Sequence, residues 1–158
     1  ARYADEVEKL VLLGTPHDFS PEIKDIFRAT MKQYEQMSME EIVVPKIDRA
    51  FGKLAPPEMR KFLVDDILKT AHSAYLRIGQ APIDYNPVPR YPHIRARTMI
   101  IAGELDHLGG PEEAVKLQAA LPGAEVLVLK DTGHALNLEN PEGMNQKTID
   151  FLLARNAS

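Results

Sequence analysis

Three short runs of apolar residues stand out along the chain, which otherwise mixes apolar and polar positions. The runs cover residues 10–13 (LVLL), 99–102 (MIIA) and 126–129 (VLVL), and each ends near a glycine or a polar turn. Near-continuous apolar runs of this length are typical of parallel strands that are covered on both faces. The pattern therefore predicts three buried strands.

Helical patterns follow the second and the third run. Pro111 is followed by two acids, by apolar residues at helical spacing, and then by Pro122-Gly123, which ends the pattern. A last helix is predicted to begin at Pro141 and to include Phe151 and Leu152. The order strand, helix, strand, helix indicates an α/β fold with parallel strands and right-handed crossovers.

Residues 20–92 contain no convincing strand and are predicted to be helical. Ser38 and Glu41 have the spacing of a capping box, and Pro45 is expected to distort or shorten the helix that follows. The predicted helices begin near Ser20, Ser38, Pro56-Pro57 and Ala71. About seventy residues are far more than a crossover needs. We therefore expect two parts: an α/β core formed by residues 1–19 and 93–158, and an inserted all-helical cap over residues 20–92.

Composition excludes several classes of function. The net charge of −4 argues against nucleic-acid binding, and no apolar run approaches the roughly 18 residues that cross a bilayer. The first residues lack the pattern of a signal peptide, so a cytoplasmic location is the simple expectation. Cysteine is absent and no two histidines have the His-x-x-x-His spacing, so no metal and no cofactor is predicted. The first residue is alanine, as expected after removal of a Met or in a piece of a longer chain.

Three motifs in order resemble the C-terminal half of an α/β-hydrolase. EVEKLVLLGTP is similar to the sixth strand of that family, and TMIIAGELD, with Pro111 after it, is similar to the seventh strand and its acid loop. GHALNLENPEGMNQKTIDFL is similar to the histidine loop and the last helix. The helical insertion lies where family members carry a cap. The resemblance covers nearly the whole chain and implies the C-terminal portion of the hydrolase sheet, three parallel strands with helices.

The resemblance implies that Asp106 is the acid of a catalytic triad and His134 the general base. The two residues are 28 positions apart and follow neighbouring strands, at the carboxyl ends where open α/β sheets hold their sites. In such a triad His134 would move the proton of a hydroxyl nucleophile, and Asp106 would hold the imidazole in the useful tautomer. The implied substrate is a small ester, lactone or related acyl compound.

The family's nucleophile elbow, Gly-x-Ser-x-Gly, is absent from this sequence. None of the four serines fits an elbow: they are Ser20, Ser38, Ser73 and Ser158. We therefore expect a separate chain or a missing N-terminal part to supply the nucleophile, and this chain alone to be inactive. The uncovered edge of the strand at 10–13 predicts a large interface with that partner.

Other interpretations remain beside this one. Retention of the fold without activity, as a binding or scaffold module, is the main alternative. A nucleotide-binding domain is disfavoured because Gly14-Thr15-Pro16-His17 holds a single glycine. Asp18 is a less favoured candidate for the acid, and Glu104 is expected to be a structural carboxylate. The remaining histidines are expected in loops or on surfaces: His17, His72, His93 and His107.

Overall fold

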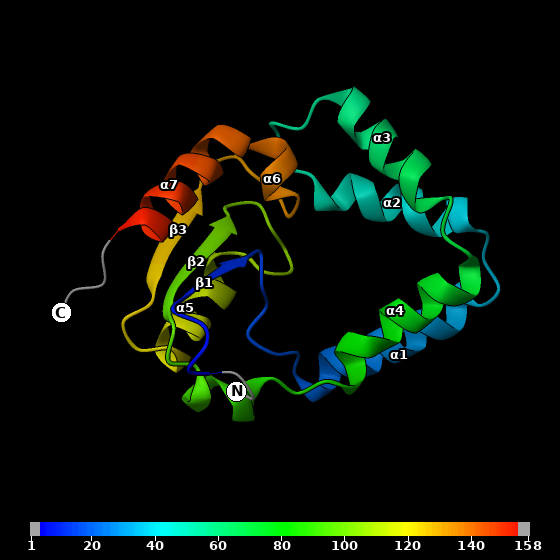
Figure 1. Cartoon of the computed structure of the whole chain (residues 1–158). Helices are drawn as coiled ribbons and strands as arrows, with labels where there is room; N and C mark the ends of the chain where they lie inside the picture. Colours follow the sequence, from blue (N-terminus) through cyan, green and yellow to red (C-terminus); the bar gives the residue numbers. More distant parts are fainter. Residues whose placement is uncertain (1–3, 155–158) are drawn as a thin grey trace. The chain divides into compact units, whose positions relative to one another are not determined.

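Three parallel strands form one sheet in the computed structural model, which describes residues 4–154. The strands are β1 (Lys9–Leu13), β2 (Arg97–Gly103) and β3 (Glu125–Leu129), in the spatial order β1-β2-β3 (Figure 1). Leu12 pairs with Ile100, and Ile100 pairs with Val126. The prediction of three parallel strands is confirmed.

The central strand β2 is buried on both faces. Helix α5 (Pro111–Ala120) covers one face and α7 (Pro141–Leu153) covers the other (Figure 1). Alternate β2 side chains enter the two layers: Ile100 and Ala102 pack with Leu117 of α5, and Met99 and Ile101 pack with Met144 and Phe151 of α7. Full burial of one such side chain stabilises the fold by about 1.5–3 kcal/mol. Both helices begin at the prolines that the sequence indicated.

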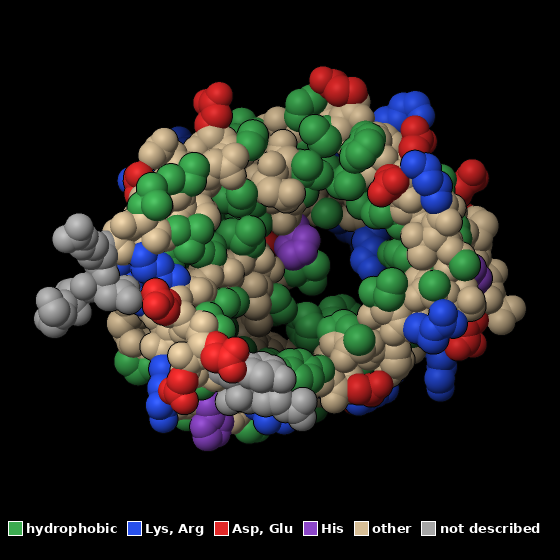
Figure 2. Space-filling view, viewed as in Figure 1, with side chains coloured by type: hydrophobic (Ala, Val, Ile, Leu, Met, Phe, Trp, Pro, Cys, Tyr) green, Lys and Arg blue, Asp and Glu red, His purple; other side chains and the backbone are tan. Residues whose placement is uncertain are grey.

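Two short helices that the sequence pattern did not indicate complete this part of the chain. They are the 3-10 helix η1 (Val88–His93) before β2 and the single turn α6 (Leu136–Glu139) before α7. Hydrophobic side chains remain exposed over α7 (Figure 2), at Ile149, Leu152 and Leu153.

The inserted region consists of four helices. They are α1 (Pro21–Tyr34), α2 (Met39–Ala50), α3 (Pro57–Ile67) and α4 (His72–Asp84). The side chain of Ser20 accepts a hydrogen bond from the backbone N–H of Ile23 and caps α1. Ser38 and Glu41 exchange side-chain and backbone hydrogen bonds, which confirms the predicted capping box.

Proline does not shorten the inserted helices. Helix α2 continues through Pro45, and α4 continues through Pro82 to Asp84. Of the two expected effects of Pro45, distortion or shortening, the shortening does not occur. A proline inside a helix costs about 3 kcal/mol or more. Buried Ile42, Val43 and Ile47 lie on both sides of Pro45, and their burial offsets that cost.

The chain divides into two compact units. Within the described residues, the first unit comprises 4–17, 50–55 and 89–154, and the second comprises 18–49 and 56–88. Segment 50–55 belongs to the first unit, whereas the sequence interpretation counted it with the insertion. Its backbone is bonded to the loop after β3, where the N–H of Lys53 donates to the carbonyl of Asp131 over 3.0 Å. Among the described residues, no helix combines the length and apolar character needed to cross a bilayer.

Candidate active site

The loops after β2 and β3 are bonded to each other. The backbone N–H of Glu104 donates to the carbonyl of Leu129, and that of Leu105 donates to Thr132, both over 2.9 Å. The carboxylate of Glu104 accepts the N–H of Asp131 over 2.8 Å. Through this hydrogen bond Glu104 links its own loop to the loop after β3, as expected for a structural carboxylate. These bonds hold the two strand ends in one rigid corner.

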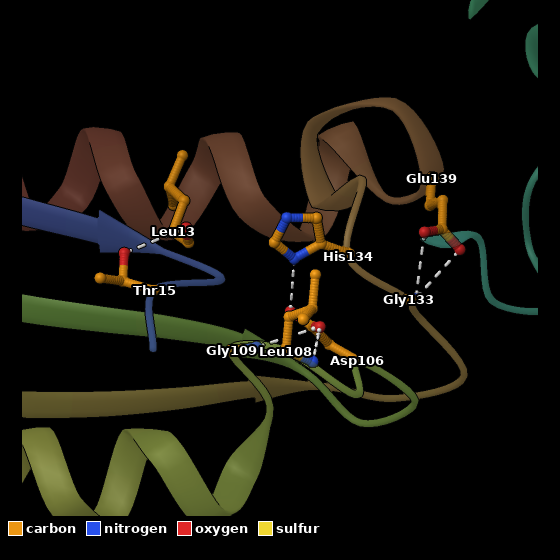
Figure 3. Close-up of polar contacts among 8 residues, drawn as sticks. All are labelled: Leu13, Thr15, Asp106, Leu108, Gly109, Gly133, His134 and Glu139. Atoms are coloured by element: carbon orange, nitrogen blue, oxygen red, sulfur yellow. Dashed lines mark hydrogen bonds and ion pairs between the residues drawn. The ribbon is translucent and has the colours of Figure 1, made fainter. Parts of the chain in front are cut away.

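Asp106 lies in the loop after β2 with its side chain fully buried. Its Oδ1 accepts the backbone N–H groups of Leu108 at 2.8 Å and Gly109 at 3.1 Å. The carboxylate therefore orders its own loop, and Oδ2 is left to face another residue. Figure 3 shows that this second oxygen faces the imidazole of His134.

His134 lies in the loop after β3, which turns sharply because Asp131 adopts the left-handed conformation at φ 55°. The backbone N–H of His134 donates to the carbonyl of Ala50 over 2.6 Å. Its Nδ1 lies 2.9 Å from Oδ2 of Asp106 (Figure 3). The structure thus brings together the two residues that the sequence selected.

The charge of Asp106 determines the tautomer of the imidazole. An ionised carboxylate can only accept hydrogen bonds, so Nδ1 of His134 carries the proton between them. In a neutral imidazole Nε2 is then left as a lone-pair acceptor. The His134 side chain is 40% exposed, whereas the Asp106 side chain is 0% exposed, so the pair has a buried acid and an accessible base.

The environment shifts the pKa of both groups. Burial opposes ionisation of Asp106 most strongly, but hydrogen bonds from His134, Leu108 and Gly109 together outweigh it and lower its pKa below 3.8. The hydrogen bond to Asp106 raises the pKa of His134 above 6.5; burial opposes this, and the charges of Asp106 and Glu139 add to it. Both directions favour the ion pair over its neutral form.

Gly14 closes the site at the end of β1. Its N–H donates to the carbonyl of Ile101 over 2.9 Å, and its φ of 51° lies in the left-handed region. A Cβ at this position would lie 3.1 Å from Oδ2 of Asp106 and 3.2 Å from Nδ1 of His134. Gly14 therefore covers the acid–base pair closely, a role that the sequence analysis missed.

Glu139 is a second residue whose role was missed. It is the last residue of α6 and is 6% exposed. Its carboxylate accepts the N–H of Gly133 at 3.0 and 3.1 Å (Figure 3). It also accepts the N–H of Gly52 at 2.6 Å. The motif Glu139-Asn140-Pro141-Glu142 marked this position, but no local pattern indicated a buried carboxylate.

The other candidates lie elsewhere. Asp18, the less favoured acid, pairs with Lys24 at 3.2 Å in the second unit. The backbone N–H of His17 donates to Glu113, and Nε2 of His72 lies 2.9 Å from the carbonyl of Tyr34. His93 and His107 are exposed.

No hydroxyl of a serine is available beside His134 within the first unit. Ser20 and Ser38 cap helices and Ser73 lies in α4, all in the second unit, while Ser158 lies outside the described residues. The described part of the first unit contains neither serine nor cysteine. Over residues 4–154, no group of three His, Asp or Glu side chains is arranged to hold a metal ion.

Comparison with known proteins yields a consistent set of relatives. A family model described as "Alpha/beta hydrolase family" matches residues 4–147. Polyketide synthase ThaQ of Burkholderia thailandensis is 29% identical over 112 residues, which cover 67% of this chain and 5% of that protein. A 2-hydroxy-6-oxononadienedioate/2-hydroxy-6-oxononatrienedioate hydrolase of Escherichia coli is 30% identical over 64 residues, 40% of this chain and 22% of that protein.

Solved structures share the fold. An esterase of Exiguobacterium antarcticum matches with a TM-score of 0.83 at 18% identity, over 94% of this chain and 58% of that chain. An enol-lactonase of Burkholderia xenovorans matches with a TM-score of 0.83 at 23% identity, over 97% and 59%. The chain thus spans somewhat under 60% of the length of these two hydrolases, and a smaller share of the curated relatives.

Proposed function

Because this chain belongs to the alpha/beta hydrolase family, we propose that it carries the acid and the base of a hydrolase for small esters, lactones or related acyl compounds. The esterase and the enol-lactonase that share its fold motivate this substrate class. The observation that carries the proposal is the 2.9 Å contact between Asp106 and His134, with the base accessible and the acid buried.

The proposed chemistry is acyl transfer in two halves. In the first, Nε2 of His134 takes the proton of a nucleophilic hydroxyl while its oxygen attacks the carbonyl carbon. The imidazolium, stabilised by Asp106, then protonates the leaving alcohol as the acyl–oxygen bond breaks. In the second half, His134 takes a proton from water as the water oxygen attacks the acyl carbon; the imidazolium returns the proton to the nucleophile's oxygen as its bond to the acyl group breaks, and the acid product leaves.

The nucleophile is proposed to come from a polypeptide outside this chain, either an N-terminal part or a second chain. The absence of serine and cysteine from the described residues of the first unit supports this, as does the partial coverage of the matched hydrolases. Within the described residues β1 has one strand neighbour, so its other edge is available for pairing. Exposed Leu13 and the apolar side chains over α7 are suited to contact with that polypeptide.

The test uses the complete hydrolase, meaning this chain together with the polypeptide that supplies the nucleophile. Hydrolysis of p-nitrophenyl acetate and of a small lactone is measured for wild type, His134→Gln and the control His93→Gln. Removal of the base is expected to lower the rate about 10³-fold or more. The control, at an exposed histidine of η1, should keep wild-type activity.

Two results would contradict the proposal. Activity that persists in His134→Gln would remove His134 from the mechanism. Hydrolysis by the chain alone at the rate of the complete enzyme, lost in His134→Gln, would show that no outside nucleophile is required.

A non-catalytic binding role is the second candidate, favoured by the lack of a serine or cysteine in the described first unit. The Asp106–His134 pair argues against it, because a buried carboxylate bonded to Nδ1 of an accessible imidazole is the arrangement of an acid–base pair. Purification of the chain from its source cell without a nucleophile-bearing polypeptide would favour this second role.

A further inference from the structure

The proposed mechanism makes no use of Glu139, although this carboxylate is almost completely buried. Burial of an unpaired carboxylate costs several kcal/mol. Among the described residues, no lysine or arginine forms an ion pair with Glu139. Its hydrogen bonds go instead to the backbone N–H groups of Gly52 and Gly133.

These two N–H groups belong to two segments that lie against each other. Gly133 directly precedes His134, and Gly52 lies in segment 50–53. The two segments are also joined by His134 N–H to the Ala50 carbonyl at 2.6 Å and by Lys53 N–H to the Asp131 carbonyl at 3.0 Å. The carboxylate of Glu139 therefore forms a further bridge between them.

The approach of the two backbones leaves no room for a side chain. A Cβ at Gly52 would lie 2.5 Å from the nitrogen of Gly133, and a Cβ at Gly133 would lie 2.3 Å from the nitrogen of Gly52. Both distances are far below van der Waals contact. Gly52, Gly133 and the buried Glu139 thus form one closely packed contact next to His134, called the joint below.

We infer that Glu139 is a positioning residue, which holds segment 50–53 against the loop of His134 and so aims the imidazole at Asp106. The inference rests on the proposed function, because it assigns a purpose to the orientation of the base. A displacement of about 1 Å in a catalytic group can cost 10²-fold in rate. The Glu139 carboxylate limits such a displacement, because it bonds both to Gly133, the residue before His134, and to Gly52 in the segment that supports the loop.

Two substitutions separate the hydrogen bonds from the charge. In Glu139→Gln the amide oxygen can occupy the place of Oε2, which accepts from both Gly52 and Gly133. The NH₂ group then takes the place of Oε1, and only the 3.1 Å contact of Oε1 with the Gly133 N–H is lost. Glu139→Ala removes both acceptors. Glu142→Gln, at an exposed carboxylate in the first turn of α7, is the matched control.

Kinetics of the complete hydrolase give the first readout. We expect Glu139→Ala to lower kcat about 10²-fold with little change in KM. Glu139→Gln should stay within about threefold of wild type, because a neutral acceptor keeps most of each hydrogen bond. Wild-type kcat in Glu139→Ala, or equal losses in the two variants, would overturn the inference.

NMR of the chain gives a second readout that needs no activity. The Nδ1–H signal of His134, identified by its absence in His134→Gln, should persist in Glu139→Gln and be lost in Glu139→Ala. If Glu139→Ala does not fold, Gly52→Ala disrupts the same joint from the other side and should give the same loss. A sharp, unshifted signal in both disrupting variants would refute the inference.

The proposed function and this inference fail in different ways. Activity in His134→Gln removes the base itself and with it the proposed function. An inactive His134→Gln together with a fully active Glu139→Ala removes only the role of Glu139.

Discussion

Replacement of Asp106 by Asn should separate catalysis from stability. The change keeps the shape of the side chain, and its Oδ1 can still accept from Leu108 and Gly109. The group that faces His134 becomes an NH₂ donor, which requires Nδ1 of the imidazole to accept. The proton then moves to Nε2, where the base needs a lone pair. Asp106→Asn should therefore trap His134 in the wrong tautomer.

The structure indicates how large each effect should be. Two of the three hydrogen bonds to the carboxylate survive, and the bond to His134 is lost as a charged contact, worth about 1.5–3 kcal/mol. Burial, the largest influence on the pKa of Asp106, opposes its charge, and a neutral amide escapes that cost. The net loss of stability should thus be about 1–2 kcal/mol. The same substitution in a well-studied protease lowers kcat about 10⁴-fold, or about 5.5 kcal/mol of barrier.

Two measurements test this separation. Urea unfolding of the chain gives the free energy of unfolding, and p-nitrophenyl acetate hydrolysis by the complete enzyme gives kcat. ¹⁵N NMR of labelled histidine reports which nitrogen of His134 carries the proton. Protonation that stays on Nδ1 in Asp106→Asn, or a loss of stability that matches the loss of rate, would refute the reasoning.

Three further predictions concern the same unit. Because the pKa of His134 is raised above 6.5 and that of Asp106 is lowered below 3.8, the pair, which Glu139 also faces, should stabilise the chain most between about pH 4 and 6.5. This contribution should fade as the pH rises through the folded-state pKa of His134 or falls through that of Asp106. Urea unfolding at a series of pH values measures it, and the same dependence of unfolding free energy on pH in His134→Gln as in wild type would contradict the prediction. Gly14→Ala should lower both the free energy of unfolding and kcat, because its Cβ would crowd Asp106 and His134. Gly123 also has a positive φ, but no atom lies within 4 Å of where its Cβ would be. Gly123→Ala should therefore lower only the free energy of unfolding, by about 1 kcal/mol. Leu117 of α5 is 0% exposed and packs against β2, so Leu117→Ala should lower the free energy of unfolding by about 2–5 kcal/mol. A loss below about 1 kcal/mol would contradict its place in the core.

The central strand could be predicted because it is buried on both faces, whereas β1 and β3, also expected to be buried, are largely half-buried along their length. A strand such as 99–102 must be apolar at every position when α5 and α7 cover it, so its sequence is a continuous run. Helix starts were also readable, since Ser20 and Ser38 act through bonds within three residues. The effect of Pro45 was not, because the burial that offsets it depends on contacts from outside the helix.

Of the candidate site, only the residues marked by strand ends and by sequence motifs could be predicted. Asp106 and His134 follow adjacent parallel strands, so topology alone brings them near each other. Gly14 and Glu139 act through close approaches between distant segments; Glu139 bonds to Gly52, 87 residues away. Patterns of neighbouring residues do not indicate contacts between positions so far apart in the sequence, so the contact of Glu139 with Gly52 could not be predicted.

The two members of the pair are oriented by different means, and this bears on what the proposed outside polypeptide would supply. Asp106 takes two of its hydrogen bonds from its own loop, so its direction is fixed without His134. His134 is fixed by Ala50 behind it and by Asp106 at Nδ1. Both orientations therefore depend only on residues of the first unit. Under the proposed function, the outside polypeptide would supply a hydroxyl to Nε2, together with the donors that stabilise the developing oxyanion.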